Sequence, residues 1–386
     1  MGSSRPKVEI GWIVEGDPRP ELRQIVKGSM DRTQRALSGA MPGFEWIMEA
    51  VDRPGEPGRG RLEPVRLLDS AETDRDARGW DFTIVITELE LRGRSQPQVL
   101  GMTSSIFATA LISLSFIASA TGDEAGLEHR VHSLAMHLFG RLNGLSPDRS
   151  DGFMRAIESP GDLDRMDGFD AADIALLTER MDDVADLRVE ELQEARDSTL
   201  HFYARSLWEN RNALPGAVTR MQPWSFPLRL RRLTTAAGSA LAVLVMTAES
   251  WEVAANLSFQ TIFILSLVSL AGTSAYLLKA QRLLAPRRGP LREQRVVSNA
   301  GTVIAVVIGM LVTYFAVFSV AYLMATGLFD DGLLGKWVGP SGAALAEVRG
   351  HMAALAASLS LVIGALGASF EPYGYFRHVM QIDAEV

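Results

Sequence analysis

The sequence has no cysteine among its 386 residues, which excludes disulfide bonds and thiolate metal sites and fits a reducing cytosol. The N-terminal run MGSSRPKVEIGWIVEG lacks the apolar core of a signal peptide, so we expect the first domain to stay in the cytoplasm. Gly55–Gly60 is not followed by the Lys-Ser/Thr pair of a phosphate-binding P-loop. A net charge of −8 argues against nucleic acid as a partner.

Charged residues are scarce in the C-terminal third, where long hydrophobic runs predict membrane-spanning helices. Crossing a hydrocarbon core of about 30 Å takes about 20 apolar residues. The first run is the weakest because it ends at Glu249, and its alternative is an interfacial helix. The other three contain no ionisable residue, which disfavours a pump or a proton-coupled transporter. We expect four spans, at residues 233–251, 259–278, 300–326 and 352–370.

Basic residues set the expected orientation of these spans. They gather before the first span and between the second and third, at Arg229, Arg231, Arg232, Lys279, Arg282, Arg287, Arg288, Arg292 and Arg295. By the positive-inside rule, the N-terminal domain, the basic loop and the C-terminus then face the cytoplasm. The chain is expected to be a multi-pass protein of the inner (plasma) membrane. Arg287 and Arg288 are also candidate contacts for anionic lipid headgroups.

The first half of the chain reads as a soluble sheet domain. Apolar alternation and β-branched residues predict strands at residues 8–15, 44–51, 64–68, 82–91, 98–103 and 110–116, with helices at 20–37 and 123–142. Strands separated by one helix and several loops indicate an α+β or α/β domain. We divide the chain into a soluble domain (1–170), a helical stalk and linker (171–232), a membrane region (233–371) and a cytoplasmic tail (372–386).

Three histidines, His129, His132 and His137, fall on the helix expected at 123–142. Zincin proteases place two histidines four residues apart, so that both imidazoles leave the same helix face. His132 and His137 are five apart, which separates them by about 140° around the helix axis. They do not easily share one ion, whereas His129 and His132 have a spacing that permits it. On spacing alone, a structural cluster of histidines is the simpler interpretation.

The run that starts at His137, HLFGRLN, resembles the second half of the metzincin motif HExxHxxGxxH. Gly140 takes the place of the glycine at which the chain turns, Asn143 that of the third ligand, and Met154 that of the Met-turn methionine. The order of elements from Lys7 to Met154 resembles the archaemetzincins, a bacterial and archaeal branch of zinc metallopeptidases. The resemblance implies an α+β fold, with a zincin-like mixed sheet and an active-site helix, ahead of the α-helical transmembrane bundle.

The same resemblance implies a degenerate site. Ser133 and Leu134 stand where the family has its first ligand and its catalytic glutamate. Serine is a poor zinc ligand and leucine cannot move a proton. The cysteines that bind a second metal in archaemetzincins are absent. No catalytic residue is therefore assigned, and His137, Asn143 and His132 are the remaining candidate ligands. No cofactor is expected, with zinc as the single candidate.

These features favour a membrane-anchored, non-catalytic metzincin-like domain that binds a protein or peptide, for example by pairing it with an edge strand. One alternative is a membrane-tethered zinc metallopeptidase with atypical ligands. Its site would combine His137 with another histidine or Glu128, and with Asp148 or Asp151 from the following loop. A second alternative is a channel or membrane effector that the soluble domain gates. The expected partners are the lipid bilayer and a peptide, not nucleic acid.

Overall fold

A computed structural model gives the fold, in which the chain forms two compact units. The sheet unit comprises residues 1–206, 287–296 and 381–386, and the helical unit comprises residues 207–286 and 297–380. The structure describes residues 5–17, 19–54, 61–93, 96–119, 124–147, 152–193, 213–281, 283–284, 292–338, 344–369, 377–378 and 381–386.

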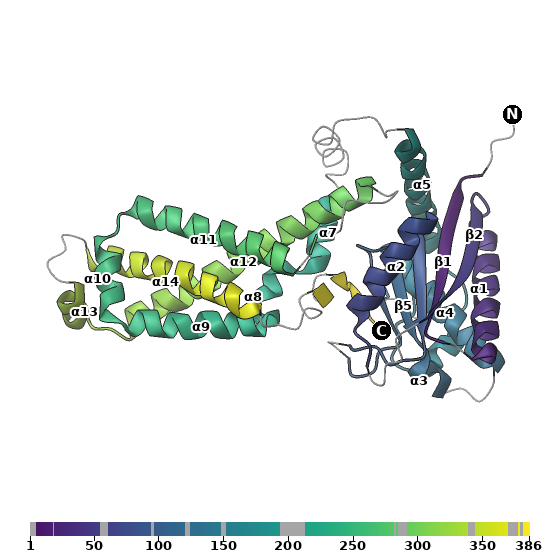
Figure 1. The fold of residues 1–386 in the computed structure, drawn as a ribbon, viewed down its shortest axis with the longest axis horizontal. Helices are drawn as coiled ribbons and strands as arrows, with labels where there is room; N and C mark the ends of the chain where they lie inside the picture. Colours follow the sequence, from purple (N-terminus) through teal and green to yellow (C-terminus); the bar gives the residue numbers. More distant parts are fainter. Residues whose placement is uncertain are drawn as a thin grey trace. The chain divides into compact units, whose positions relative to one another are not determined.

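The sheet unit is built on a six-stranded mixed sheet (Figure 1). In spatial order its strands are β2 (Glu45–Arg53), β1 (Lys7–Glu15), β3 (Phe82–Thr87), β5 (Thr109–Ser113), β4 (Gly101–Ser104) and β6 (Ala384–Glu385). The first four are parallel, β4 pairs antiparallel with β5, and β6 pairs antiparallel with β4. Every residue of β3 is buried, as expected for a parallel strand covered on both faces.

Helices cover both faces of this sheet. α1 (Pro20–Ala40) and α4 (Glu124–Leu142) share one hydrophobic core with Trp12, whereas α2 (Pro64–Arg78) shares a second core with Ile13. Neighbouring residues of a strand point to opposite faces, so Trp12 and Ile13 enter cores on opposite sides of β1. The predicted fold class is confirmed: a mixed sheet carries a buried helix at α4, and a helical region follows.

The strand predicted at residues 64–68 is wrong, because these residues begin helix α2. Pro64 stands at the first helical position, where its fixed φ and missing N–H are tolerated. The buried side chains of Leu68, Ala71, Glu72 and Arg75 then follow at helical spacing, and this pattern runs on through charged residues beyond the short apolar run. The interpretation as a strand used only that apolar run.

Two further boundaries differ from the expectation. The predicted strand at 82–91 stops at Thr87 in β3, and Leu91 forms only an isolated parallel bridge with Leu62. The strand predicted at 110–116 ends at Ser113, after which α3 (Leu114–Ser119) begins. The helix predicted as a stalk from residue 171 is α5 (Ala171–Gln193), and residues 194–212 of the predicted stalk and linker lie outside the described residues.

The remaining elements are short turns of 3-10 helix and the helices of the helical unit. Their bounds are η1 (Pro160–Arg165), α7 (Ala213–Met221), η2 (Pro223–Ser225), α8 (Phe226–Arg229), α9 (Arg231–Met246), α10 (Ala248–Asn256), α11 (Phe259–Ala280), α12 (Arg292–Gly327), α13 (Asp331–Val338) and α14 (Leu345–Ala368).

Three helices among the described residues are long and apolar enough to cross a membrane: α11, residues 299–327 of α12, and α14. Helices α9 and α10 meet this criterion only as a pair, and they are bent by 82° at the break between them. At the break, the Trp251 indole N–H donates to Val245 O over 2.9 Å and so satisfies a carbonyl at the end of α9. The first expected span therefore comprises α9 and the beginning of α10.

Small residues bring α14 close to α9. A Cβ atom placed on Gly364 would lie 2.9 Å from Leu233 O, and one placed on Gly367 would lie 2.6 Å from Ala236 Cβ. The two backbones can approach this closely only because both positions on α14 are glycine, which is typical of helix packing in membranes.

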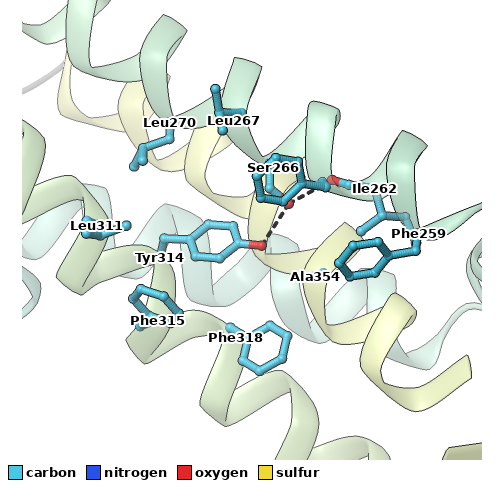
Figure 2. A pocket seen from close by; sticks show the side chains of 11 residues that line it. Phe259, Ile262, Ser266, Leu267, Leu270, Leu311, Tyr314, Phe315, Phe318 and Ala354 are labelled. Carbon is cyan, nitrogen blue, oxygen red and sulfur yellow. Dashed lines mark hydrogen bonds between the residues drawn. The ribbon is translucent and has the colours of Figure 1, made fainter. Parts of the chain in front are cut away.

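A cavity of about 320 Å³ lies between α11, α12 and α14 (Figure 2). Most of its wall is apolar and includes Phe263, Leu267 and Phe315. Two hydroxyls, of Ser266 and Tyr314, lie on this wall; they bond to each other at 2.9 Å, and Ser266 Oγ also bonds to a serine of α14, Ser358, at 3.0 Å. These hydrogen bonds link the three helices. The residues that line the cavity carry no charge.

Candidate functional site

Helix α4 carries the histidines singled out in the sequence. Its residues from Arg130 to Gly140 are all buried, because the sheet covers one side of the helix and α1 covers another. Leu134 and Leu138 lie in the core shared with the sheet. The helix is thus apolar over most of its circumference, and any polar side chain on it needs a partner within the protein.

His137 is fully buried, and its two ring nitrogens have different surroundings. Nδ1 lies 2.7 Å from Phe153 O, and because a carbonyl only accepts, Nδ1 carries the proton. Nε2 then holds a lone pair and has no hydrogen-bond partner among the residues that the structure describes. Burial lowers the pKa of His137 to about 4, although the bond to Phe153 opposes the shift, so the ring is neutral near pH 7. A carbonyl that fixes one nitrogen while the other stays free is how proteins orient ligand histidines.

Ser133 lies one helical turn before His137. Its Oγ is fully buried and, within the described part of the chain, also has no hydrogen-bond partner. Residues four apart lie on the same helix face, so α4 presents two unpartnered polar atoms, Oγ and Nε2, at the spacing of a zincin histidine pair. The neighbouring Leu134 packs in the sheet core and is fully buried.

His132 is held by a different element. Its Nδ1 lies 2.9 Å from Thr33 Oγ1 on α1, and the Thr33 hydroxyl also bonds to Ser29 O at 2.8 Å. Since Ser29 O only accepts, the hydroxyl proton goes to that carbonyl and the ring donates to Thr33 from Nδ1. The His132 ring also packs edge-on against Phe153. Burial, with Arg32 and other nearby positive groups, lowers the pKa of His132 to about 3.

The chain does not turn at Gly140, which lies within α4. The helix ends two residues later, at Leu142, in a Schellman motif in which Leu145 N–H donates to Gly140 O and Gly144 N–H donates to Arg141 O. Gly144 adopts the left-handed conformation that this motif needs, with φ of 92°. Gly140 has another use: a Cβ there would lie 2.5 Å from Met154 Sδ, so the missing side chain makes room for Met154.

Asn143 caps the C-terminal end of α4, and its side-chain amide donates to Phe139 O at 2.9 Å. Asn143 follows His137 by six positions. On a continuous helix, this spacing rotates a residue by about 240° around the axis and displaces it by about 9 Å along it. Asn143 therefore does not lie on the helix face that carries Ser133 and His137.

The donor set on this face does not fit a catalytic zinc. Such a site needs three protein ligands and a group that takes a proton from bound water. The face offers one imidazole nitrogen, a neutral hydroxyl and no carboxylate, since Leu134 occupies the core. His129 and Glu128 belong to the first half of α4, where Glu128 O accepts from Ser29 of α1. Asp148 and Asp151 lie outside the described residues, as do Arg287 and Arg288.

The edge strand beside α4 is already paired. Leu138 of α4 packs over Gly101 of β4, where an added Cβ would lie 2.7 Å from Leu138 Cδ1. One edge of β4 pairs with β5, and β6 pairs with the opposite edge, with Met102 opposite Glu385 and Thr103 opposite Ala384. The sequence gives no signal for this pairing, because a two-residue strand has no periodicity of its own.

Comparison with solved structures places the first part of the chain beside the archaemetzincins. It resembles the archaemetzincin of Methanopyrus kandleri, with 20% identity and a TM-score of 0.38, over 47% of this chain and 99% of that one. A zinc-dependent peptidase of Methanocorpusculum labreanum matches with 16% identity and a TM-score of 0.35, over 43% and 99%. The archaemetzincin of Archaeoglobus fulgidus, complexed with malonate, matches with 17% identity and a TM-score of 0.30, over 43% and 99%.

The resemblance expected from the residues up to Met154 is thus confirmed as a match in fold over about 45% of the chain. No protein-family model matches the sequence, and no curated protein sequence matches it.

Sequence reasoning missed the groups that hold α4 in place. Thr33 and Phe153 engage the two buried histidines, and Arg130 donates from Nε and Nη2 to both carboxylate oxygens of Asp164, each at 2.7 Å. This bidentate pair ties α4 to η1 and lowers the pKa of Asp164. The signal in the sequence is an arginine next to the apolar residues of a helix, which indicates an acidic partner.

Proposed function

We propose that this chain is a membrane-anchored binding module with a zincin-like sheet unit that does not perform zinc catalysis. The observation that carries the proposal is the pair of unpartnered atoms at Ser133 and His137. The helix face has the spacing of a metal site, but it offers a single nitrogen of metal-ligand quality. The position beside Ser133 is a leucine in the core, and so, among the described residues of this helix face, no general base stands next to the lone imidazole.

One observation favours a second candidate, an atypical zinc peptidase. His137 is oriented as a ligand histidine is, with Nδ1 fixed by Phe153 O and Nε2 free. The solved structures similar to this fold include a protein described as a zinc-dependent peptidase. This candidate requires further ligands from residues outside the described part of the chain, such as Asp148 or Asp151.

The third function considered, a channel, gains no support from the helical unit. The cavity between α11, α12 and α14 is apolar, and its Ser266 hydroxyl is engaged by neighbouring helices. Ion paths through membranes are lined by ionisable or polar groups that face water.

Anchoring in the membrane is also part of the proposal, and the sheet supports a particular number of crossings. Strands β4 and β6 pair with each other, yet they precede and follow the whole helical unit in the sequence. Both ends of the helical unit then return to one side of the membrane, which requires an even number of spans. Three straight spans and the bent α9–α10 pair together make four. The basic loop after α11 favours the cytoplasmic side for the sheet unit.

Zinc content tests the absence of catalysis. The full chain is purified in detergent, saturated with zinc, desalted and measured by inductively coupled plasma mass spectrometry. We expect far less than one zinc per chain, and the same value for His137→Ala and for the matched control His132→Ala. One zinc per chain that disappears in His137→Ala alone would overturn the proposal in favour of the peptidase.

A further inference from the structure

Strand β6 occupies the free edge of β4, although the residues that form it follow all the membrane helices. Backbone and side-chain hydrogen bonds on both sides of the paired residues help to hold it. Leu100 N–H and Gly101 N–H donate to Val386 O at 2.7 and 3.1 Å, and Val386 N–H donates to Gly101 O at 2.9 Å. Asp383 N–H donates to Thr103 O at 2.9 Å, and the Asp383 carboxylate accepts from Ser105 N–H at 2.5 Å. This is the bonding by which a sheet receives an added peptide strand.

Side chains of the same segment reach both cores of the sheet unit. Ile382 packs against the core that contains Ile13, and Val386 packs against the core that contains Trp12. Ala384, between them, is 9% exposed. The β4 edge therefore selects an apolar residue at each end of the segment, a small residue between them, and a carboxylate at position 383.

The segment is short and stays partly open to solvent. The paired strand is two residues long, and Ile382, Asp383, Glu385 and Val386 keep intermediate exposure. A strand held in this way is retained mainly because the chain keeps it near its site, which raises its effective concentration. The same edge lies next to α4, since Leu138 packs over Gly101.

We propose that the β4 edge is a peptide-binding site whose resident ligand is the chain's own segment Gln381–Val386. An extended peptide with the same pattern of an apolar residue, Asp, a small residue, Glu and an apolar residue displaces the segment and takes its place. The segment is thus a built-in competitor that keeps the site closed until a partner binds. The inference names the partner and the regulation of the binding module proposed above, and rests on that function.

Peptide binding to the full chain in lipid nanodiscs tests the competition. The probe is a fluorescein-labelled peptide with the sequence of residues 381–386, followed by fluorescence anisotropy. We expect weak binding to the natural chain and at least tenfold tighter binding to a chain that lacks residues 382–386. Equal affinities for the two chains would overturn the inference.

A disulfide lock provides the matched control. Thr103 and Ala384 are direct partners in the ladder, and the chain has no other cysteine, so Thr103→Cys with Ala384→Cys gives a single possible bridge. The oxidised variant should bind no peptide, and dithiothreitol should restore the affinity of the natural chain. The reduced sample shows that the variant is folded. If the oxidised variant still binds the peptide, the site lies elsewhere and the inference is overturned. The zinc measurement does not depend on either result.

Discussion

The polar residues of α4 show which features of the site a sequence can reveal. A spacing of five placed His132 and His137 on different sides of the helix, and they do engage different elements, Thr33 on α1 and Phe153 beyond α4. The identity of those partners was not predictable. Thr33 is 99 residues away from His132, and nothing in its local pattern marks it as the partner of a histidine.

The two buried histidines make stability depend on pH. Burial lowers their pKa values to about 3 and about 4 from 6.5, so between pH 6.5 and about 4 the unfolded chain binds protons that the folded chain does not. The free energy of unfolding has its full value above pH 6.5. It decreases as the pH is lowered, and at pH 5 each histidine has reduced it by about 2 kcal/mol.

Thermal unfolding of the full chain in detergent at pH 7.5 and pH 5.0, followed by tryptophan emission, measures this dependence. The combined substitution His132→Gln and His137→Gln should reduce the difference in melting temperature between the two pH values. A natural chain that melts at the same temperature at both pH values would contradict the assignment.

The hydroxyls of Ser133 and Thr33 should respond oppositely to removal. Ser133 Oγ is buried without a partner, so Ser133→Ala should stabilise the sheet unit by about 1 kcal/mol. Thr33→Val keeps the side-chain shape but leaves Nδ1 of His132 unpaired, which should cost about 1–3 kcal/mol. Chemical denaturation of both variants gives the comparison. If Ser133→Ala is as destabilising as Thr33→Val, the Ser133 hydroxyl has a ligand that the side chains do not supply.

Among the elements, those with a long periodic pattern were predictable. Helix α1 and helix α4 begin and end within a few residues of the expected ranges, and β1, β2 and β3 lie where β-branched residues alternate. Helix α2 was missed because its buried face continues beyond the apolar run at 64–68 through two charged residues, Glu72 and Arg75, which a hydrophobic pattern does not register. The position of the turn after α4 was missed because Gly140 and Gly144 look equivalent in the sequence, and only the left-handed φ of Gly144 separates them.

Two glycines on helices separate packing from helix propensity. Gly140→Ala places a Cβ against Met154 Sδ, Leu145 and Phe169, so it should cost about 1–3 kcal/mol despite the better propensity of alanine. Gly39, near the end of α1, has no atom within 4 Å of an added Cβ, and Gly39→Ala should stabilise by up to about 1 kcal/mol.

Melting temperatures of the two variants provide the measurement, and adding Met154→Ala to Gly140→Ala should recover part of the loss. Equal shifts for Gly140→Ala and Gly39→Ala would show that Met154 does not pack against Gly140.

For the whole molecule, the number of crossings in the proposed membrane topology depends on α9 and α10. If this pair crosses, Asn256 and Asp331 face the outside, while Glu158 and Lys279 face the cytoplasm. The natural chain lacks cysteine, so single substitutions to Cys at these four positions can be labelled without interference. An impermeant maleimide added to intact cells should label Asn256→Cys and Asp331→Cys, and should reach the other two only after lysis.

The opposite result has a clear meaning. If Glu158→Cys and Asn256→Cys are both protected in intact cells, the two positions lie on the same side, the bent pair does not cross and the number of spans is odd. Strand β4 and strand β6 would then lie on opposite sides of the membrane, which is incompatible with their pairing.

The pairing of β6 with β4 also fixes an order of events during synthesis. Ser105 and Asp383, which bond to each other, are 278 residues apart. At roughly 5–20 residues per second, the ribosome needs about 15–55 s to make the intervening chain, and in the proposed topology the apolar helices insert into the membrane during that time. Throughout it the edge of β4 stays unpaired, and open edges of this kind attract other strands. On the proposed topology, completion of the sheet thus follows insertion, and the nascent sheet unit is a natural client for chaperones until β6 emerges.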